Sequence, residues 1–198
     1  AADEQIYLDK TEAFDMKNFR ELELRGKRVL VRVDFNVPLD GSRITDDIRI
    51  RMALPTLRHI LEQGGKLVIC SHLGRPKGQR VDSMSLAPVA ARLAELLDCK
   101  VPLAPDCVGP EAENLAGPME SGEVLLLENL RFHPGETDND PEFCEQLARF
   151  AEVYVNDAFA VSHRAHASVS GVPERVAEKG AGHLLQQELD YFQQAMQD

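Results

Sequence analysis

The sequence predicts an α/β fold, a three-layer α/β/α sandwich with a mainly parallel, Rossmann-like sheet. Two observations lead to this prediction. Short runs of β-branched and other apolar residues recur along the 198 residues, and segments with apolar residues at helical spacing lie between several of them. Strands and helices that alternate in this way form right-handed βαβ crossovers, which place helices on both faces of a parallel sheet.

Five short runs have the composition of buried strands. They span residues 29–33, 66–70, 101–103, 124–127 and 153–156, and each is rich in Val, Ile or Leu. Continuous apolar runs of this length are typical of parallel strands that are covered on both faces. We therefore expect these five runs to form the sheet.

Two helices are predicted between the strands. The first has cap oxygens at residues 45–47, ends at Gly64 and Gly65, and carries an apolar stripe of Ile50, Leu54, Leu57 and Leu61. Pro55 fits this helix only within its first turns, because proline has no N–H to donate. The second helix follows candidate caps at Ser83 and Ser85, and its stripe is Leu86, Val89, Leu93, Leu96 and Leu97.

The two ends of the chain and one internal segment carry other signals. Residues 1–15 precede the first predicted element and indicate an N-terminal extension, native or added. The polar residues 134–141 predict a mobile loop. After Gly180 and Gly182, an exit helix is predicted over residues 184–198, with an apolar stripe of Leu184, Leu185, Leu189, Phe192 and Met196.

The charge balance excludes several classes of partner. The chain has 22 Lys and Arg against 33 Asp and Glu, and its net charge of −11 argues against nucleic acid and anionic membranes. No apolar run approaches the roughly 20 residues that cross a bilayer. The four cysteines lack metal-like spacing, which favours reduced thiols and a cytoplasmic protein. Any anion site would therefore be a local basic cluster.

Polar and charged residues follow the predicted strands. In a parallel α/β sheet, ligands bind at the carboxyl ends of the strands, so these residues are expected to meet at one edge. Asp34 and Asn36 follow the first strand, and Asp106 follows the third as a weaker candidate. The other strands are followed by mostly basic side chains, which are His72, Arg75, Arg131, His163, Arg164 and His166.

Several arginines at one rim of an acidic protein form a phosphate-recognition pattern. Arg75, Arg131 and Arg164 would each contribute a guanidinium, and Arg49 would join them from the start of the first helix. A guanidinium binds phosphate in a bidentate manner and stays charged. The acid and amide that follow the first strand suit hydroxyl groups instead. The pattern predicts a small phosphorylated hydroxy acid as the ligand.

Plainer interpretations exist for these residues. An exposed arginine is usually solvated surface, and Arg32 would simply pair with Asp34. Glycines 74 and 78 are expected in turns, because no Walker-type motif follows a strand. An alternative function is a metal-dependent hydrolase with zinc on His72, His163 and His166, although no carboxylate-bearing helical pattern accompanies these histidines.

Several motifs together resemble the phosphoglycerate kinase family. The most specific is Val-Leu-Val-Arg-Val-Asp-Phe-Asn-Val-Pro at residues 29–38. The similarity continues in family order through residues 47–51, 71–76, 126–132, 156–159 and 163–166. It extends from about residue 17 to the end of the chain.

The resemblance implies reversible phosphoryl transfer between 1,3-bisphosphoglycerate and MgADP, giving 3-phosphoglycerate and MgATP, across a cleft between two domains. This chain would supply the acid's side, with Arg49 as the catalytic residue that faces the transferring group. The implied substrate-binding set is Arg32, Asp34, Phe35, Asn36, Arg49, His72, Leu73, Gly74, Arg75, Arg131, His163 and Arg164. No metal ligand is expected among them.

Two features depart from the family pattern. Residues 160–162 are Ala-Val-Ser where the family usually has Gly-Thr-Ala, which puts the flexibility of that loop in question. The family also continues into a C-terminal nucleotide-binding domain, beyond Asp198. We therefore expect residues 16–183 to form a monomeric phosphoglycerate-binding domain that binds no cofactor itself and is inactive alone. The alternative is a naturally short, non-catalytic module that binds phosphorylated acids.

Overall fold

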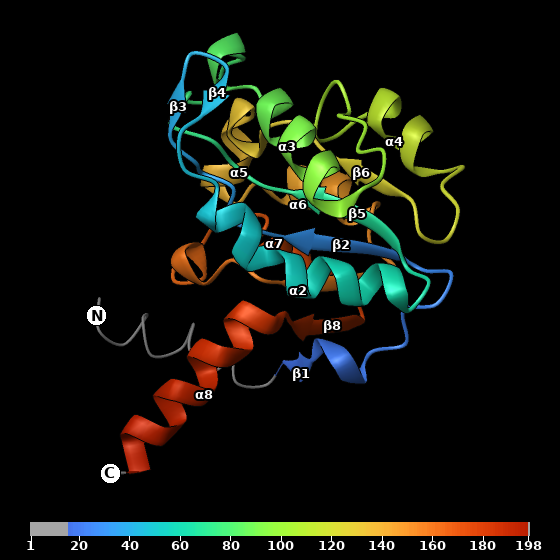
Figure 1. The fold of residues 1–198 in the computed structure, drawn as a ribbon, viewed down its shortest axis with the longest axis vertical. Helices are drawn as coiled ribbons and strands as arrows, with labels where there is room; N and C mark the ends of the chain where they lie inside the picture. The colour runs from blue at the N-terminus through green and yellow to red at the C-terminus, as the bar shows by residue number, and fades with distance from the viewer. Residues whose placement is uncertain (1–15, 198) are drawn as a thin grey trace.

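The computed structural model describes residues 16–197, which form a three-layer α/β/α structure around a parallel sheet (Figure 1). Within these residues the sheet has six strands in the order β1-β8-β7-β2-β5-β6, and all neighbouring strands are parallel. The strands are β1 (Lys17–Asn18), β2 (Arg28–Arg32), β5 (Lys66–Cys70), β6 (Val124–Leu126), β7 (Val153–Asn156) and β8 (Glu178–Ala181). The predicted fold class is confirmed.

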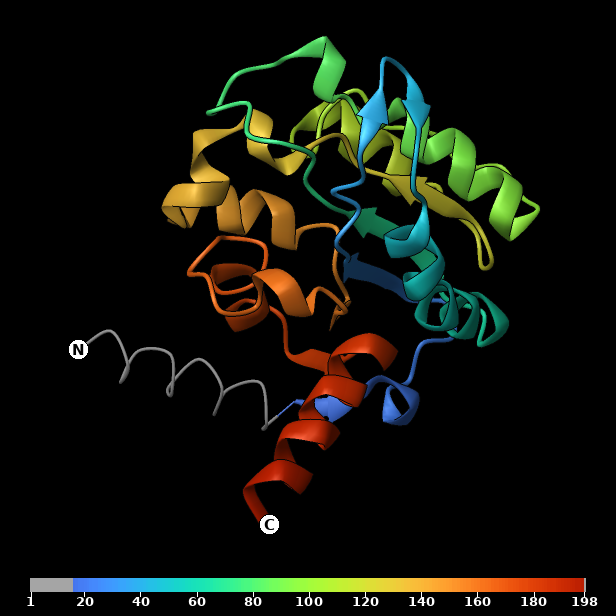
Figure 2. The same cartoon turned by 60° about the vertical axis from the view of Figure 1, so that its left-hand side comes forward.

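Helices cover both faces of this sheet. They are α2 (Ile48–Glu62), α3 (Ala87–Leu97), α4 (Pro110–Ala116), α5 (Pro134–Asp138), α6 (Pro141–Ala148), α7 (Gly171–Glu174) and α8 (His183–Gln197). Short 3-10 turns are η1 (Phe19–Glu21), η2 (Asp82–Met84), η3 (Leu130–Phe132) and η4 (Phe159–Val161), and a small antiparallel hairpin joins β3 (Leu39–Asp40) to β4 (Arg43–Ile44). Figure 2 shows α2, drawn in teal, on the opposite side of the sheet from the yellow and orange helices that follow residue 130.

The alternation of side chains along β2 divides the core into two parts. Val29 and Val31 belong to a buried cluster with residues of α2 and α3, whereas Leu30 packs on the other face with residues of α4, α6 and α7. Burial of both faces explains why β2 and β5 are apolar runs without polar alternation. Because these strands are parallel, their carboxyl ends and the loops that follow them lie along one edge of the sheet.

The ends of α2 follow the predicted chemistry, but its interior does not. Asp46 Oδ1 accepts a hydrogen bond from the N–H of Ile48 at 2.9 Å, and Gly64 ends the helix region with a φ of +77°. Pro55 lies inside the helix rather than in its first turns, so that prediction is wrong. Pro55 is exposed, and so is Arg51, the residue whose carbonyl Pro55 leaves without a helical donor.

The second predicted helix is confirmed as α3, whose N-cap residue is Leu86, and Ser85 lies one residue before that cap. Ser85 Oγ accepts a hydrogen bond from the N–H of Ala87 at 3.2 Å. Val89 and Leu93 of its apolar stripe are fully buried in the first core cluster. The apolar stripe of this helix could therefore be predicted from the sequence, and one of the two candidate serines contacts its first residue.

Two segments differ from the prediction. Residues 101–103 form no strand, although Leu103 makes a single parallel bridge to Leu126. Pro102 has no N–H for a ladder, which limits the pairing to this bridge. Residues 134–141 were predicted as a mobile loop, but Pro134 starts helix α5 and Asp140 caps α6 by accepting a hydrogen bond from the N–H of Phe143 at 2.8 Å.

The two strands at one end of the sheet, β1 and β8, were not predicted, but the exit helix was. Strand β8 has the sequence Glu-Lys-Gly-Ala, which lacks the β-branched residues that indicate a strand. Helix α8 begins at His183, one residue before its predicted start, and the stripe residues Leu185 and Leu189 are buried. The predicted extension over residues 1–15 lies outside the described residues. Among the helices of residues 16–197, none is long and apolar enough to cross a membrane.

Candidate anion-binding site

The loops at the carboxyl edge of the sheet enclose a hollow of about 260 Å³. The loops after β2 and β5 contribute to it, as do η3 after β6, the segment after β7, and the first turn of α2. Its lining residues are Asp34, Asn36, Arg49, His72, Gly74, Arg75, Arg131, Ala160, Val161 and Arg164. Eight of these ten were named from the sequence, and the parallel sheet brings them together because each lies just beyond a strand or at a helix start.

Three arginines of this hollow have no carboxylate partner. The guanidiniums of Arg75 and Arg164 are exposed and form no hydrogen bond or ion pair with any described residue. Arg131 is mostly buried; its Nη1 donates to the carbonyl of Gly74 at 3.0 Å, while its Nε has no partner within residues 16–197. Burial and the positive charges of Arg32 and Arg164 lower the pKa of Arg131, which remains charged. Such a group of like charges is stabilised by an anion.

A second hollow of about 270 Å³ adjoins the first and shares its three arginines. Its other lining residues are Lys77, Gly78, Thr137 and His166. Burial, followed by the charges of Arg131 and Arg164, lowers the pKa of His166 to about 4, so this ring is neutral at physiological pH. Lys77 and Thr137 were missed in the sequence because neither directly follows a strand. The basic surface is therefore wider than the predicted set.

The first strand end supplies the other polar groups of the hollow. Asp34 Oδ2 accepts a hydrogen bond from Nη1 of Arg49 at 2.6 Å, and its Oδ1 accepts one from the N–H of Asn36 at 3.1 Å. Asn36 Oδ1 in turn accepts a hydrogen bond from the N–H of Gly74 at 2.8 Å. The alternative in which Asp34 pairs with Arg32 is wrong, because Asp34 pairs with Arg49, whereas the guanidinium of Arg32 contacts Ser168, His72 and Glu136.

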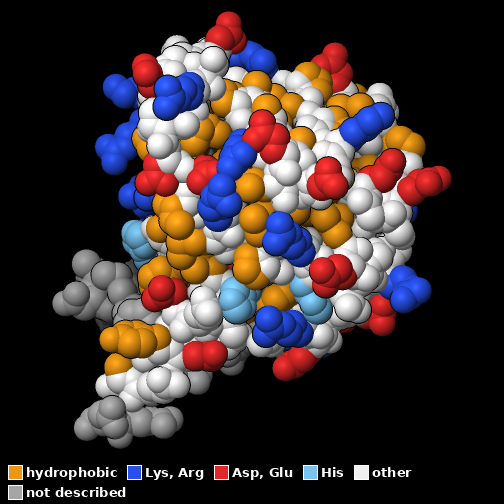
Figure 3. Space-filling view, in the orientation of Figure 1, with side chains coloured by type: hydrophobic (Ala, Val, Ile, Leu, Met, Phe, Trp, Pro, Cys, Tyr) orange, Lys and Arg blue, Asp and Glu red, His pale blue; other side chains and the backbone are white. Residues whose placement is uncertain are grey.

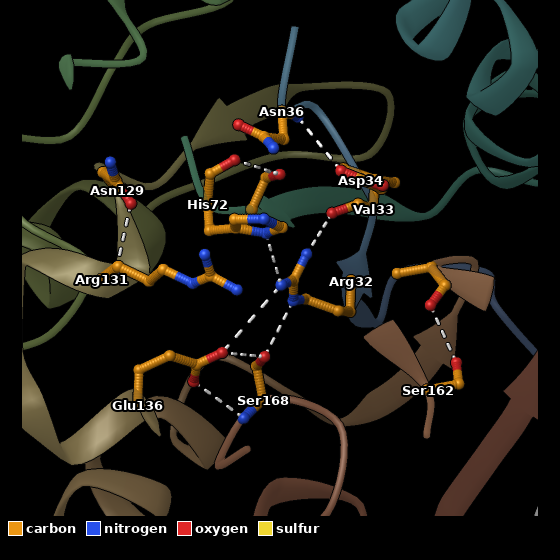
Figure 4. A network of polar contacts seen from close by, with 12 residues as sticks. Arg32, Val33, Asp34, Asn36, His72, Asn129, Arg131, Glu136, Ser162 and Ser168 are labelled. Atoms are coloured by element: carbon orange, nitrogen blue, oxygen red, sulfur yellow. Dashed lines mark hydrogen bonds and ion pairs between the residues drawn. The ribbon is translucent and has the colours of Figure 1, made fainter. Parts of the chain in front are cut away.

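Arg32 lies beneath the hollow rather than in its wall. Its side chain is fully buried, with Nε donating to Ser168 Oγ at 2.8 Å and Nη1 donating to the carbonyl of Val33 (Figure 4). Its Nη2 lies 3.0 Å from Nδ1 of His72, which does line the hollow. Burial, followed by the charges of Arg32 and Arg131, lowers the pKa of His72 to about 2. His72 is therefore a neutral ring.

Three further residues of the predicted set do not line either hollow. Phe35 and Leu73 are buried in the first core cluster, and their backbone N–H groups donate to Ser71 Oγ and Asn129 Oδ1. These two residues anchor the loops after β2 and β5 to the core instead of facing the hollow. His163 is exposed and lies outside the residues that line the two hollows.

The three histidines of the zinc alternative do not form a ligand group in residues 16–197. The group of Asp, Cys and His side chains that comes close enough to hold a metal there is Asp106, Cys107 and His133. Its carboxylate already accepts hydrogen bonds from Nε2 of His133 at 2.6 Å and from the N–H of Cys107 at 2.7 Å. Burial raises the pKa of the Cys107 thiol well above its ordinary value. These contacts account for the cluster without a metal.

The segment that departs from the family pattern forms η4 and part of the wall. Ala160 and Val161 line the first hollow, and Ser162 follows them. Ser162 Oγ donates to the carbonyl of Ala158 at 2.8 Å and accepts a hydrogen bond from Asn156 Nδ2 at 3.1 Å. This serine therefore ties the segment to the end of β7.

Comparison with known proteins agrees with the motifs. The family model described as Phosphoglycerate kinase matches residues 19–198. The phosphoglycerate kinase of Desulfotalea psychrophila is 67% identical over 184 residues, which are 92% of this chain and 47% of that protein. The phosphoglycerate kinase of Rippkaea orientalis is 54% identical over 181 residues, which are 91% of this chain and 45% of that protein.

Solved structures show the same relationship. The structure of phosphoglycerate kinase from Coxiella burnetii matches with a TM-score of 0.80 and 39% identity, over 88% of this chain and 43% of that one. The enzyme from Pyrococcus horikoshii OT3 matches with a TM-score of 0.80 and 34% identity, over 88% and 44%. The chain thus spans about half the length of the relatives it matches. With its motifs in order, its sheet and its matched residues 19–198, the chain belongs to the phosphoglycerate kinase family.

Proposed function

We propose that this chain is the part of a phosphoglycerate kinase that binds 3-phosphoglycerate and 1,3-bisphosphoglycerate. The observation that carries the proposal is the group of Arg75, Arg131 and Arg164, three guanidiniums without a carboxylate partner at the carboxyl edge of the sheet. A phosphate dianion supplies the negative charge that this group lacks. Each charge-assisted contact contributes about 1.5 to 3 kcal/mol, enough for three of them to hold a small anion.

The remaining residues of the hollow suit the rest of such a ligand. His72 is neutral and adds a hydrogen-bond donor beside the arginines. Asp34 and Asn36 provide partners for the hydroxyl and carboxyl end of the acid. The proposed orientation places the non-reacting phosphate on the three arginines and the other end of the acid toward Asp34 and Arg49.

Arg49 is the residue that we propose for the catalytic role in phosphoryl transfer to and from MgADP and MgATP. Phosphoryl transfer depends on positioning and on neutralising the charge that spreads over the moving group, which a guanidinium supplies. The hollow does not fit the magnesium nucleotide itself, because its carboxylate, Asp34, is already paired with Arg49 at 2.6 Å. The nucleotide would therefore bind to the half of the relatives' length that this chain does not match.

A calorimetric titration of the 198-residue chain with 3-phosphoglycerate tests the proposal, with ATP plus magnesium as the comparison ligand. We expect the acid to bind and the nucleotide not to bind. Binding of the nucleotide alone would contradict the proposal. Turnover of ATP by this chain would contradict the proposal that it is the half that binds phosphoglycerate and not the nucleotide.

The remaining proposals follow from the same role. A glycolytic function places the protein in the cytoplasm, and we propose that the chain is a monomer. Sedimentation equilibrium measures the second point directly, with a mass of 22.0 kDa expected. A mass of twice that value at low concentration would contradict it.

A further inference from the structure

Glu136 is a fully buried carboxylate on α5, in the segment that the sequence predicts as a mobile loop. Both of its oxygens are hydrogen-bonded to one residue. Oε1 accepts from Ser168 Oγ at 2.5 Å, and Oε2 accepts from the N–H of Ser168 at 3.0 Å. A buried charge is costly unless it is paired and hydrogen-bonded, so this arrangement has to serve a partner of opposite charge.

That partner is Arg32, whose side chain is also fully buried. Its Nη2 lies 4.0 Å from Glu136 Oε1, and its Nε donates to the same Ser168 hydroxyl at 2.8 Å. Ser168 Oγ therefore accepts from Arg32 and donates to Glu136. Figure 4 shows the contacts that join Arg32, Ser168 and Glu136, with the guanidinium of Arg131 extending toward them.

The chain of contacts continues from Arg32 to His72. A guanidinium has only donors, so the Nη2 of Arg32, 3.0 Å from His72 Nδ1, makes that ring nitrogen the acceptor. The neutral ring then carries its proton on Nε2. Because His72 lines the hollow, this Nε2–H is its available donor toward a ligand.

We propose that Glu136 is a positioning residue of the binding site, which acts through Ser168 and Arg32 to hold His72 in the tautomer that donates from Nε2 to the ligand phosphate. The inference rests on the proposed function, because it names the donor that the phosphate would meet. Glu136 touches no ligand itself. Its carboxylate also offsets the positive charge of Arg32 beneath the three arginines of the hollow.

A purely structural role makes a different prediction. If the Arg32–Glu136 pair only holds α5 against β2, its loss lowers the free energy of unfolding but leaves the folded protein's binding unchanged. The tautomer of His72 separates the two roles, because packing alone does not determine which ring nitrogen carries the proton. This tautomer is read from the ring ¹⁵N chemical shifts of the chain without ligand.

The test is Glu136→Gln, which keeps the shape of the side chain. The carboxamide places an NH₂ group or a neutral oxygen against Ser168 and removes the charge that faces Arg32. We expect the Nδ1–H tautomer of His72 to become populated and 3-phosphoglycerate to bind about tenfold more weakly, the loss of one directed contact. Glu145→Gln, at an exposed position of the neighbouring helix α6, is the matched control and should change neither reading.

A second variant keeps the test decisive if Glu136→Gln does not fold. Ser168→Ala removes the shared hydroxyl but keeps both charges, and it should shift the same His72 signals. Unchanged ring ¹⁵N shifts and unchanged affinity in a folded Glu136→Gln variant would overturn the inference. A wild-type chain that shows the Nε2–H tautomer but does not bind 3-phosphoglycerate would instead contradict the proposed function. The positioning of His72 by Glu136, Ser168 and Arg32 would then still hold.

The double variant His72→Gln/Glu136→Gln shows whether the effect passes through His72. If it does, the double variant binds 3-phosphoglycerate no more weakly than His72→Gln alone, since coupled residues are not additive. Losses that add in full would show that Glu136 does not act through His72, and the inference would fail.

Discussion

The arginines on the surface of α2 and α3 differ from those at the carboxyl edge of the sheet. Between the two helices, Asp47 accepts hydrogen bonds from Nε of Arg51 at 2.9 Å and from Nε of Arg92 at 2.8 Å, and Arg92 also contacts Glu95. The hydrogen bonds from Arg51 and then Arg92 lower the pKa of Asp47. On the face shown in Figure 3, Lys and Arg side chains are interspersed with Asp and Glu in the same way.

At the carboxyl edge of the sheet, three arginines have no carboxylate partner. Arg75, Arg131 and Arg164 lie together without a carboxylate partner among the described residues, although the chain has eleven more acidic than basic residues, 33 against 22. Some other arginines, such as Arg43, also lack a carboxylate partner among the described residues, but here three of them line one hollow. This difference supports the proposal that an anionic ligand supplies the negative charge at the sheet edge, and the following experiments test the contrast between the two regions.

The largest effect is expected from Arg131→Ala on ligand binding. Arg131 is the mostly buried member of the unpaired group, so its removal should weaken 3-phosphoglycerate binding by about 1.5 to 3 kcal/mol, or about 10- to 150-fold. Calorimetric titration measures the change. Arg92→Ala, from the paired group, is the control and should leave affinity unchanged; an equal loss in both variants would remove the distinction.

A buried carboxylate at the end of β7 offers the opposite case, a negative charge without a cation. Burial raises the pKa of Asp157 from 3.8 to about 6, although hydrogen bonds from Thr56 and from the N–H groups of Leu184 and Leu185 act against the shift. Between about pH 4 and pH 6, the folded protein therefore keeps a proton on Asp157 that the unfolded chain has released. Asp157 thus favours the folded state below about pH 4, and this contribution is lost as the pH rises through about 6.

Asp157→Asn should therefore raise the free energy of unfolding at pH 7 by about 2 kcal/mol and remove this part of the pH dependence. The asparagine oxygen still accepts from the first N–H groups of α8. Urea unfolding at pH 4 and pH 7 measures the difference. Asp190→Asn, at an exposed position of α8, is the control; equal behaviour of the two variants would show that Asp157 is ionised at no cost.

A smaller effect is expected on the stability of the protein without bound phosphate. Arg164→Ala removes one of three like charges, so without phosphate it should leave the free energy of unfolding unchanged or raise it by up to about 0.5 kcal/mol. Arg92→Ala removes a paired charge and should lower stability instead. Thermal unfolding in a phosphate-free buffer measures both, and stabilisation by added phosphate should be strong in wild type and reduced in Arg164→Ala. A lower melting temperature for Arg164→Ala in the empty state would contradict the contrast.

The smallest effect on binding is expected from Arg49→Ala. Arg49 lines the hollow, but its guanidinium is paired with Asp34, as in the α2–α3 surface group. Affinity of the chain for 3-phosphoglycerate should change by less than about 0.5 kcal/mol, whereas kcat of a complete enzyme carrying the variant should fall strongly, because the proposed role is at the transition state. Equal losses in affinity and kcat would place Arg49 with the unpaired group.

Much of the site could be predicted from the sequence because parallel strands impose a simple geometry. Once residues 29–33, 66–70, 124–127 and 153–156 are recognised as parallel strands, the residues after them have to meet at one edge. Arg75, Arg131 and Arg164 therefore came together as expected. Periodicity was likewise sufficient for α2, α3 and α8, whose apolar stripes are local properties of the chain.

What the sequence could not supply depends on contacts between distant segments. Glu136 lies in a polar stretch, and it becomes a buried residue only because Ser168, 32 residues away, satisfies its oxygens and Arg32 supplies the opposite charge. Strand β8 pairs with β7 through backbone hydrogen bonds, so its side chains do not indicate a strand in the sequence. By itself the sequence determined strands β2, β5, β6 and β7, helices α2, α3 and α8, and the basic edge, because local pattern encodes them. Only the tertiary structure decided which charges are paired, since pairing depends on which distant segments folding brings into contact.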